Sequence, residues 1–349
     1  MTDVSRISKG MYWDRAWSLA SGCTHVSPGC DNCWSAKETH MRASNPNEKV
    51  RARNQGLTEK GCFNGQIRLN HEFLDKPLRK KKPTVYAVWN DLFHEDVPFE
   101  FIDCVFAVMA SAGQHTFLVL TKRPGRMYEY MQRVAASGPE AASRYTEKLM
   151  NFHEQHIEKY AAGWMSPPTP EPEARFIYDS AIEYEDATSK YKSIFYERQC
   201  HWRKWPLSNV WLGVTAENQE MADNRIPILL QTPAAVRFVS VEPMLGPVDL
   251  TSVRFDRSIS MNVLEGCGIN LKSYAQSIPN IFCNKLDWVI CGGESGPGSR
   301  PIHPDWVRSL RDQCQVAGVK FFLKQMHING KLVKMPELDG RIWNEFPIS

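Results

Sequence analysis

Thr116-Phe-Leu-Val-Leu-Thr-Lys-Arg123 is an apolar run of strand length that ends abruptly in two cations. Consecutive apolar residues are typical of a parallel strand that is covered on both faces. Beyond this run, Met127, Tyr128, Met131 and Val134 recur at the spacing of one helix face. The stretch therefore predicts one strand–helix unit of a parallel α/β fold.

The same unit recurs along the chain. Six further apolar runs have strand length: Trp17–Ser21, Thr84–Trp89, Val210–Val214, Val236–Val241, Trp288–Cys291 and Val319–Leu323. Helical spacing follows two of them, in the sets Ile102, Val105, Phe106, Met109 and, after Pro304, Val307, Leu310, Cys314. We therefore expect an α/β fold whose six or seven parallel strands form an open sheet or an incomplete (β/α) barrel.

The length of 349 residues fits a single barrel-like domain over residues 1–349 that carries two insertions. The first insertion covers residues 137–207, with a helical pattern at first and then a Pro-rich stretch, Pro167–Pro172. The second covers residues 251–285, and we expect it to be irregular.

The composition, with 42% hydrophobic and 23% charged residues, is that of a soluble globular protein. A net charge of +3 neither favours nor excludes a nucleic-acid partner, so local patches must decide. The chain has no run of about 18 apolar residues and no apolar signal-peptide core, which predicts no membrane span and a cytoplasmic location. Ten cysteines fit that reducing compartment, where clustered thiols bind metal.

Cys23, Cys30 and Cys33 lie close together on a Gly- and Pro-containing stretch that follows the first predicted strand. Thiolates at this spacing suit an iron–sulfur cluster or zinc. A structural zinc site would need a fourth ligand, for which His25, His40 and Cys62 are the candidates. A deaminase-type zinc centre is unlike this pattern, because no His-x-Glu precedes a Pro-Cys-x-x-Cys motif and Gly29 separates Pro28 from Cys30.

Polar residues follow the end of nearly every predicted strand. Because ligands bind at the carboxyl ends of parallel strands, these residues and the cysteine stretch should converge on one site. The candidates are Asn90, Asp91, Lys122, Thr215, Glu217, Asn218, Glu242, Gly292, Gly293 and Glu294. Helix caps, ion pairs at the barrel rim and a tight glycine turn are the structural alternatives for them.

Two basic groups are candidates for contact with phosphates. Arg79-Lys80-Lys81-Lys82 follows Lys76, and Lys49, Arg51 and Arg53 form a second group on a predicted loop. Such groups either bind a nucleic-acid backbone or form a solvated face. Among the tryptophans near the cysteines and strand ends, which are Trp13, Trp17, Trp34 and Trp89, one could stack on adenine or on a base.

A cysteine triad after the first strand of an incomplete barrel resembles the radical S-adenosylmethionine (SAM) superfamily. The sequence departs from its common pattern in two ways. Six residues, not three, separate Cys23 from Cys30, and Trp89-Asn90-Asp91 stands where a Gly-Gly-Glu usually ends the second strand.

Several stretches are similar to a narrower group, the phage and prophage three-cysteine-motif proteins placed among radical SAM enzymes. They are Gly22–Trp34, Asn90–Pro98, Leu120–Pro124, Trp211–Asn218, Ser240–Pro247 and Gly292–Arg300. Some phage members are linked to hypermodification of thymidine in viral DNA, as isomerases that rearrange an aminoacyl group on the base.

The resemblance implies a 4Fe–4S cluster on Cys23, Cys30 and Cys33, with SAM on the open iron and its methionine and ribose parts held by the ten strand-end residues. It further implies an isomerase that acts on DNA or a modified nucleoside in the host cytoplasm, in evasion of host restriction. Flavodoxin or ferredoxin would be the electron donor. No catalytic residue is assigned. Two alternatives stay open: a radical SAM enzyme for a peptide or small molecule, and a zinc-stabilised nucleic-acid-binding protein without enzymatic activity.

Overall fold

The computed structural model describes residues 4–7, 9–136, 205–257, 259–270, 281–282 and 284–347. Nearly all of the first predicted insertion, residues 137–204, lies outside the described residues. Within the described residues, none of the helices combines the length and the apolarity needed to span a bilayer.

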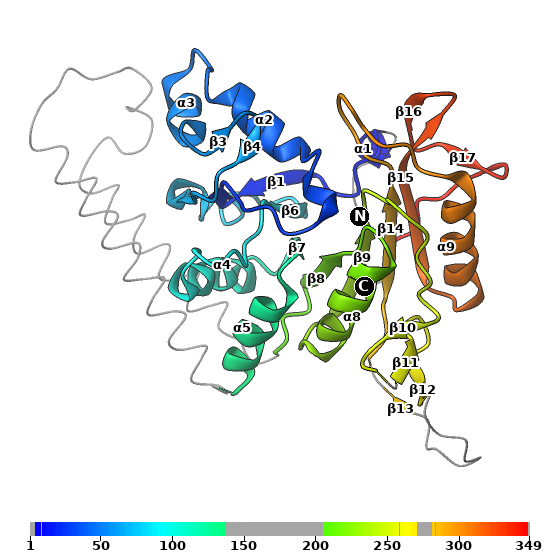
Figure 1. Ribbon diagram of the computed structural model, residues 1–349. Coiled ribbons are helices and arrows are strands. Elements are labelled where there is room, and N and C mark those ends of the chain that lie inside the picture. The colour runs from blue at the N-terminus through cyan, green and yellow to red at the C-terminus, as the bar shows by residue number, and fades with distance from the viewer. Residues whose placement is uncertain are drawn as a thin grey trace, which may run out of the picture.

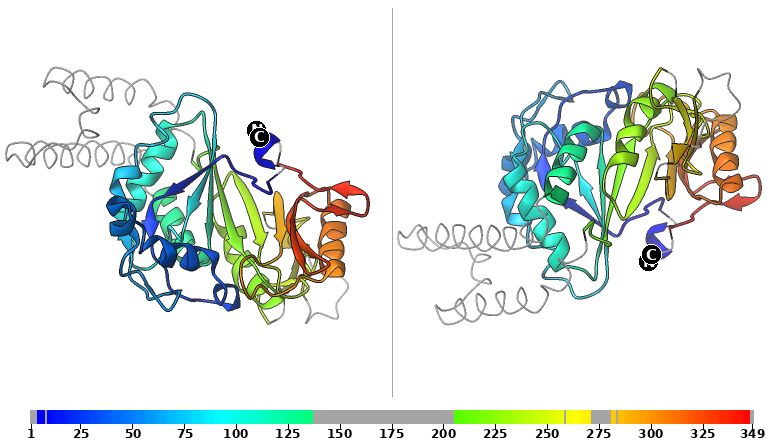
Figure 2. Two further views of the ribbon diagram at one scale, coloured as in Figure 1. Left: turned by 90° about the horizontal axis from the view of Figure 1, so that it is seen from above. Right: turned by 90° about the horizontal axis from the view of Figure 1, so that it is seen from below.

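A curled sheet of eight strands forms the centre of this mixed α/β fold (Figure 1). In spatial order its strands are β1 (Arg15–Ser18), β6 (Val85–Trp89), β7 (Thr116–Thr121), β8 (Val210–Thr215), β9 (Val236–Val241), β14 (Trp288–Gly292), β15 (Lys320–Ile328) and β16 (Lys331–Lys334). The first seven are parallel, and β16 returns antiparallel to β15. The seven predicted strands are thus confirmed, and together they curl into a half-barrel (Figure 2).

The first predicted strand differs from its expected form because it is split in two. β1 belongs to the main sheet, whereas β2 (Ala20–Ser21) leaves it and pairs antiparallel with β5 (Arg68–Leu69). Gly22 then turns the chain with a φ of 95°, and a side chain there would overlap the Gln66 carbonyl oxygen, 1.9 Å from the Cβ position. This turn leads directly into the cysteine stretch.

Four helices cover the outer side of the half-barrel: α4 (Phe99–Ser111), α5 (Pro124–Ala136), α8 (Gln219–Gln231) and α9 (Pro304–Val316) (Figure 2). The predicted helices after β6, β7 and β14 are confirmed, although Tyr130 is fully buried where Tyr128 was expected on the core face of α5. Helix α8 had not been predicted, since Arg225 and Pro227 interrupt its apolar spacing.

The remaining elements are short. Helices α1 (Val4–Ile7), α2 (Trp34–Arg42) and α3 (Glu48–Asn54), the 3₁₀ turns η1 (Pro28–Cys30) and η2 (His71–Phe73), and the strand pairs β3 (Thr58–Glu59) with β4 (Cys62–Phe63) and β17 (Glu337–Leu338) with β18 (Arg341–Ile342) surround the sheet.

The expectation of an irregular second insertion was wrong for the part of residues 251–285 that the structure describes. This part contains a four-stranded antiparallel sheet of β10 (Val253–Arg254), β11 (Ile259–Asn262), β12 (Cys267–Asn270) and β13 (Ile281–Phe282). The strands have only two to four residues each, too few to show a pattern in the sequence.

The inner face of the half-barrel changes character from the amino ends of its strands to their carboxyl ends. Aromatic side chains pack together on it near the amino ends, namely Tyr12, Trp211, Phe238, Trp288 and Phe322. Because alternate residues share a face, the same rows continue through Gly213 and Ser240 to Thr215 and Glu242. The aromatic cluster therefore fills the half-barrel at the amino ends of the strands, and polar groups lie at the carboxyl ends.

Candidate functional site

The three cysteines lie on one loop, residues 22–33, between β2 and α2. Cys30 ends the turn η1, and Cys33 directly precedes the first residue of α2. All three thiols are half-buried and free of disulfide bonds. The loop thus presents three unoxidised sulfur atoms within eleven residues of chain.

Three hydrogen bonds tie this loop to the carboxyl side of different strands. Thr24 Oγ1 lies 3.0 Å from Nε2 of His94, which follows β6. The Gly29 N–H donates to Glu217 after β8 at 3.1 Å, and the Asn32 amide donates to Glu294 after β14 at 3.0 Å. The loop therefore crosses the mouth of the half-barrel, and the predicted convergence of strand ends and cysteines is confirmed.

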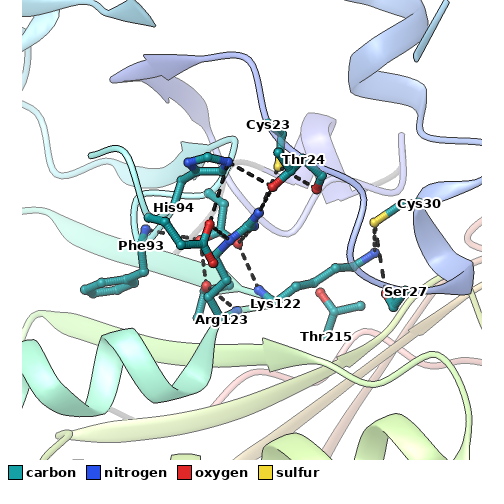
Figure 3. Close-up of polar contacts among 12 residues, drawn as sticks. Cys23, Thr24, Ser27, Cys30, Phe93, His94, Lys122, Arg123 and Thr215 are labelled. Atoms are coloured by element: carbon teal, nitrogen blue, oxygen red, sulfur yellow. Dashed lines mark hydrogen bonds and ion pairs between the residues drawn. The ribbon is translucent and has the colours of Figure 1, made fainter. Parts of the chain in front are cut away.

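Two neighbouring cations at the end of β7 point to two different thiols (Figure 3). Lys122 Nζ lies 3.5 Å from the Cys30 sulfur, and Arg123 Nη1 lies 3.7 Å from the Cys23 sulfur. Burial raises the pKa of the Cys30 thiol, but Lys122 and backbone N–H donors outweigh it, so this pKa is lowered. Burial and the Asp91 carboxylate raise the pKa of Cys23 to about 11 in spite of Arg123.

Asp91 and Asn90, which the resemblance assigns to SAM, are engaged by the protein itself. The buried Asp91 carboxylate accepts hydrogen bonds from Thr121 Oγ1 at 2.6 Å, the Lys122 N–H at 3.1 Å and Arg123 Nη1 at 2.9 Å. The Asn90 side chain donates to the Ala20 carbonyl and accepts from the Ser35 hydroxyl, both at 2.7 Å. These two side chains hold the cations and the start of α2 in place.

Glu217 is fully buried beneath the cysteine loop. Its carboxylate binds Arg225 Nη1 at 2.9 Å and the Gly29 N–H at 3.1 Å, while Arg225 also donates to the carbonyl of the buried Thr215 at 2.8 Å. Burial raises the pKa of Glu217, but Lys122 and Arg225 outweigh it and hold the pKa below its usual range. Glu217 is therefore a charged support for the backbone next to Cys30.

Asn218 has the role that its structural alternative predicts. Its side chain caps α8 by accepting the Met221 N–H at 3.0 Å. Because this oxygen already caps the helix, it is less available to bind a ligand.

Glu242, which directly follows β9, forms a partly buried ion pair with Lys324 in the middle of β15. Gly292 and Gly293 line the same region, and a side chain at either would approach Glu242 or His327 to within 3.2 Å. The glycines thus allow the strand ends to pack closely around this pair.

The Gly-rich loop after β14 fastens the far end of the cysteine loop. Arg300 binds the buried Glu294, the Asp31 carboxylate at 3.0 Å and the Pro28 carbonyl at 2.8 Å. Lys37 adds a hydrogen bond to the Pro297 carbonyl at 3.0 Å. Arg300 thus holds the two loops together.

The donors near the three cysteines bear on which metal centre the loop could hold. One zinc ion needs its thiolates about 3.8 Å apart, given Zn–S bonds of about 2.3 Å and tetrahedral angles. No three Cys, His, Asp or Glu side chains of the described chain lie close enough together to bind one ion. His25 and His40 are hydrogen-bonded to Asp31 and Thr58, and Cys62 is exposed on β4.

Sequence reasoning missed four residues that shape this site. Thr24 and Asn32 carry a signal, since both lie between or beside the cysteines, and His94 lies within the Asn90–Pro98 stretch. Arg225 has no such signal in the sequence, because only the turn between β8 and α8 brings it next to Glu217.

Comparison with known proteins gives one result. A family model described as "Protein of unknown function (DUF5131)" matches residues 7–347. Neither the curated proteins nor the solved structures contain a match.

Proposed function

Because the chain belongs to the DUF5131 family, whose description names no activity, we propose its function from the site: a radical SAM enzyme that holds a 4Fe–4S cluster on Cys23, Cys30 and Cys33. The observation that carries this proposal is a loop with three free thiols stretched across the carboxyl ends of parallel strands, with a cation on each of two thiols. This is where an α/β half-barrel binds its ligands.

Three protein ligands on a four-iron cluster leave one iron for SAM. When bound, the cluster and SAM supply an electron and a 5′-deoxyadenosyl radical, which removes a hydrogen atom from the substrate. The protein's own contribution is position and electrostatics. Lys122 and Arg123 donate to the sulfurs, and their positive charge would make a bound cluster more easily reduced. At Cys30 the lowered pKa also favours the thiolate form.

Among the ten candidate residues, Glu242 is the best placed for a direct contact with SAM. Its carboxylate and the Lys324 ammonium are 15% and 26% exposed, and they carry the charges that complement the SAM amino and carboxylate groups. Their mutual bond in the free protein is exchangeable for bonds to SAM. Backbone groups of Gly292 and Gly293 lie beside them, whereas Asn90, Asp91, Glu217, Asn218 and Glu294 hold the loops and helix.

For the substrate we propose a modified thymidine in phage DNA, on which an aminoacyl or glycyl group migrates. In such an isomerisation the hydrogen atom that is removed from the substrate is returned to it, so the substrate undergoes no net oxidation. The base must leave the helical stack, or be single-stranded, to reach the mouth. Trp34, 48% exposed and adjacent to Cys33, offers a ring for stacking such a base. Flavodoxin or ferredoxin is the proposed electron donor.

Anaerobic preparation tests the metal centre. We expect about four irons and four sulfides per chain, charge-transfer absorbance in the visible range, and SAM cleavage with a reductant. Cys30→Ala should lose the absorbance and the cleavage together, whereas Cys62→Ala, an exposed cysteine outside the loop, should keep both. Zinc without iron or sulfide would refute the proposal and support the nucleic-acid-binding alternative.

The substrate is tested separately. Enzyme, SAM and reductant are incubated with DNA that carries the aminoacylated base, and the nucleosides are analysed after digestion. Conversion of the modified nucleoside supports the DNA substrate. SAM cleavage without conversion would favour a peptide or small-molecule substrate.

A further inference from the structure

Residues 42–82, between the cysteine loop and β6, carry an uneven share of the positive charge. This segment has eleven Lys and Arg against four Asp and Glu, a net charge of +7, while the whole chain is +3. The rest of the chain is therefore −4. An excess of this kind in one short segment marks a local patch.

The fold joins the two basic groups that are separate in the sequence. Phe73, in the turn η2, has Arg53 Cζ 4.8 Å and Lys76 Nζ 3.4 Å from its ring centre. Arg53 belongs to helix α3, not to a loop as the sequence had indicated. Lys76 leads directly to Arg79-Lys80-Lys81-Lys82, so one surface connects α3 with the basic run.

This basic surface, which consists of Lys49, Arg53, Lys76, Arg79, Lys80, Lys81 and Lys82, follows the β1 edge of the sheet. The Phe73 carbonyl accepts a hydrogen bond from Trp17 of β1 at 2.6 Å, and the Lys80 carbonyl accepts one from Gln114, just before β7, at 3.2 Å. The surface therefore ends at the amino ends of β6 and β7. The cysteine loop lies at the opposite ends of the same strands.

Repulsion between these like charges disfavours the folded state, and the packing of the core does not require the charges to lie together. Burial lowers the pKa of Lys76, and the nearby Arg53 and Arg79 lower it further against Glu72 and Asp75. Arg79 is paired with Asp75, but Lys81 and Lys82 are exposed. A concentration of cations that core packing does not explain is expected where an anionic partner binds.

We propose that this basic surface binds the phosphate backbone of double-stranded DNA. The inference rests on the proposed function for the identity of the polymer, and the positive charge itself argues for a polyanion. Since the surface is remote from the mouth, it would hold the duplex while a displaced base reaches the cysteine loop. It should thus affect binding of polymeric DNA and leave the metal centre unchanged.

Salt dependence of DNA binding tests this directly on the purified full chain, with or without a cluster. The probe is a fluorescein-labelled duplex of unmodified DNA, measured by anisotropy from 50 to 200 mM salt. The test variant is Lys81→Gln/Lys82→Gln, and the matched control is Lys331→Gln/Lys334→Gln, two exposed lysines on β16 at the other edge of the sheet.

If both Lys81 and Lys82 contact phosphates, their loss reduces the slope of log K against log salt by about 1.8. Over this fourfold range the wild type would then lose about twelvefold more affinity than the test variant. The control should retain the wild-type slope, and all three proteins should share one melting temperature.

Equal slopes for the two double variants, or no binding to the duplex at 50 mM salt, would overturn the proposal. Binding to vesicles of anionic lipid in the absence of DNA binding would overturn it as well. Failure of the enzyme proposal has a different signature, because a protein without iron can still show the salt-dependent difference. An iron–sulfur protein without that difference would keep the enzyme proposal and lose this one.

Discussion

Replacing Glu217 by Gln removes the buried charge beneath the cysteine loop while keeping the shape of the side chain. Glu217 is fully buried, and its partner Arg225 is 6% exposed at 2.9 Å. The amide can still accept the Gly29 N–H, but Arg225 then lies buried without a counterion. Removing one partner of a buried ion pair costs about 3–5 kcal/mol. Because Gln keeps an oxygen that accepts the Gly29 N–H, we expect a loss of about 3 kcal/mol, at the lower end of this range.

The corresponding change in melting temperature follows from the size of the protein. An unfolding entropy of about 2.1 cal/mol/K per residue over the chain amounts to about 730 cal/mol/K, so a loss of about 3 kcal/mol lowers the melting temperature by about 4 °C. Calorimetry at pH 7 measures this shift. Glu38→Gln is the control, since its ion pair with Arg42 on α2 is exposed, at 37% and 44%, and contributes at most about 1 kcal/mol, or about 1 °C.

The pH dependence of the melting temperature tests whether the lost charge of Glu217 causes the destabilisation. A carboxyl group whose pKa is lowered in the folded state stabilises the fold above its unfolded pKa, about 4.3 for Glu, and loses this effect as the pH falls through the folded value. The gap between wild type and Glu217→Gln should be complete at pH 7 and shrink below about pH 4. A gap under 1 °C at pH 7, or one that grows in acid, would show that Glu217 does not act as a buried charge.

Two further predictions concern the cysteine loop. Arg300→Ala should raise the rate of thiol labelling in the metal-free protein by at least about tenfold, because it removes the hydrogen bonds to Asp31 and Pro28 of the loop, and one charge-assisted bond alone contributes about 1.5 kcal/mol. Arg308→Ala, which loses only pairs with Asp305 and Asp339, is the control, and equal labelling rates would contradict the role of Arg300. Trp34→Ala should weaken binding of a single-stranded oligonucleotide by about 5- to 150-fold, the equivalent of one stacked base at about 1–3 kcal/mol. Met41→Ala, which changes another exposed residue of α2, is the control and should bind like the wild type. Unchanged affinity of both variants in a titration would exclude stacking on Trp34.

The sequence by itself determined the strand–helix alternation and the end of the sheet at which the site lies. Apolar runs such as Thr116–Thr121 report burial on both faces, and burial on both faces implies a parallel sheet covered by helices. The polar residues that follow those runs then have to meet at one edge. For this reason the sequence alone predicts that the cysteine loop and the strand ends lie at the same edge of the sheet.

Only the tertiary structure decided which polar groups bind each other. Asp91 and Glu217 look alike in the sequence as carboxylates after strands, yet one holds Arg123 and the other holds Arg225 and Gly29. The contact of Arg53 and Lys76 with Phe73 was equally hidden. The physical reason is that periodicity records how deeply each residue is buried, whereas the partner of a charged side chain depends on turns and packing of segments far away in the chain.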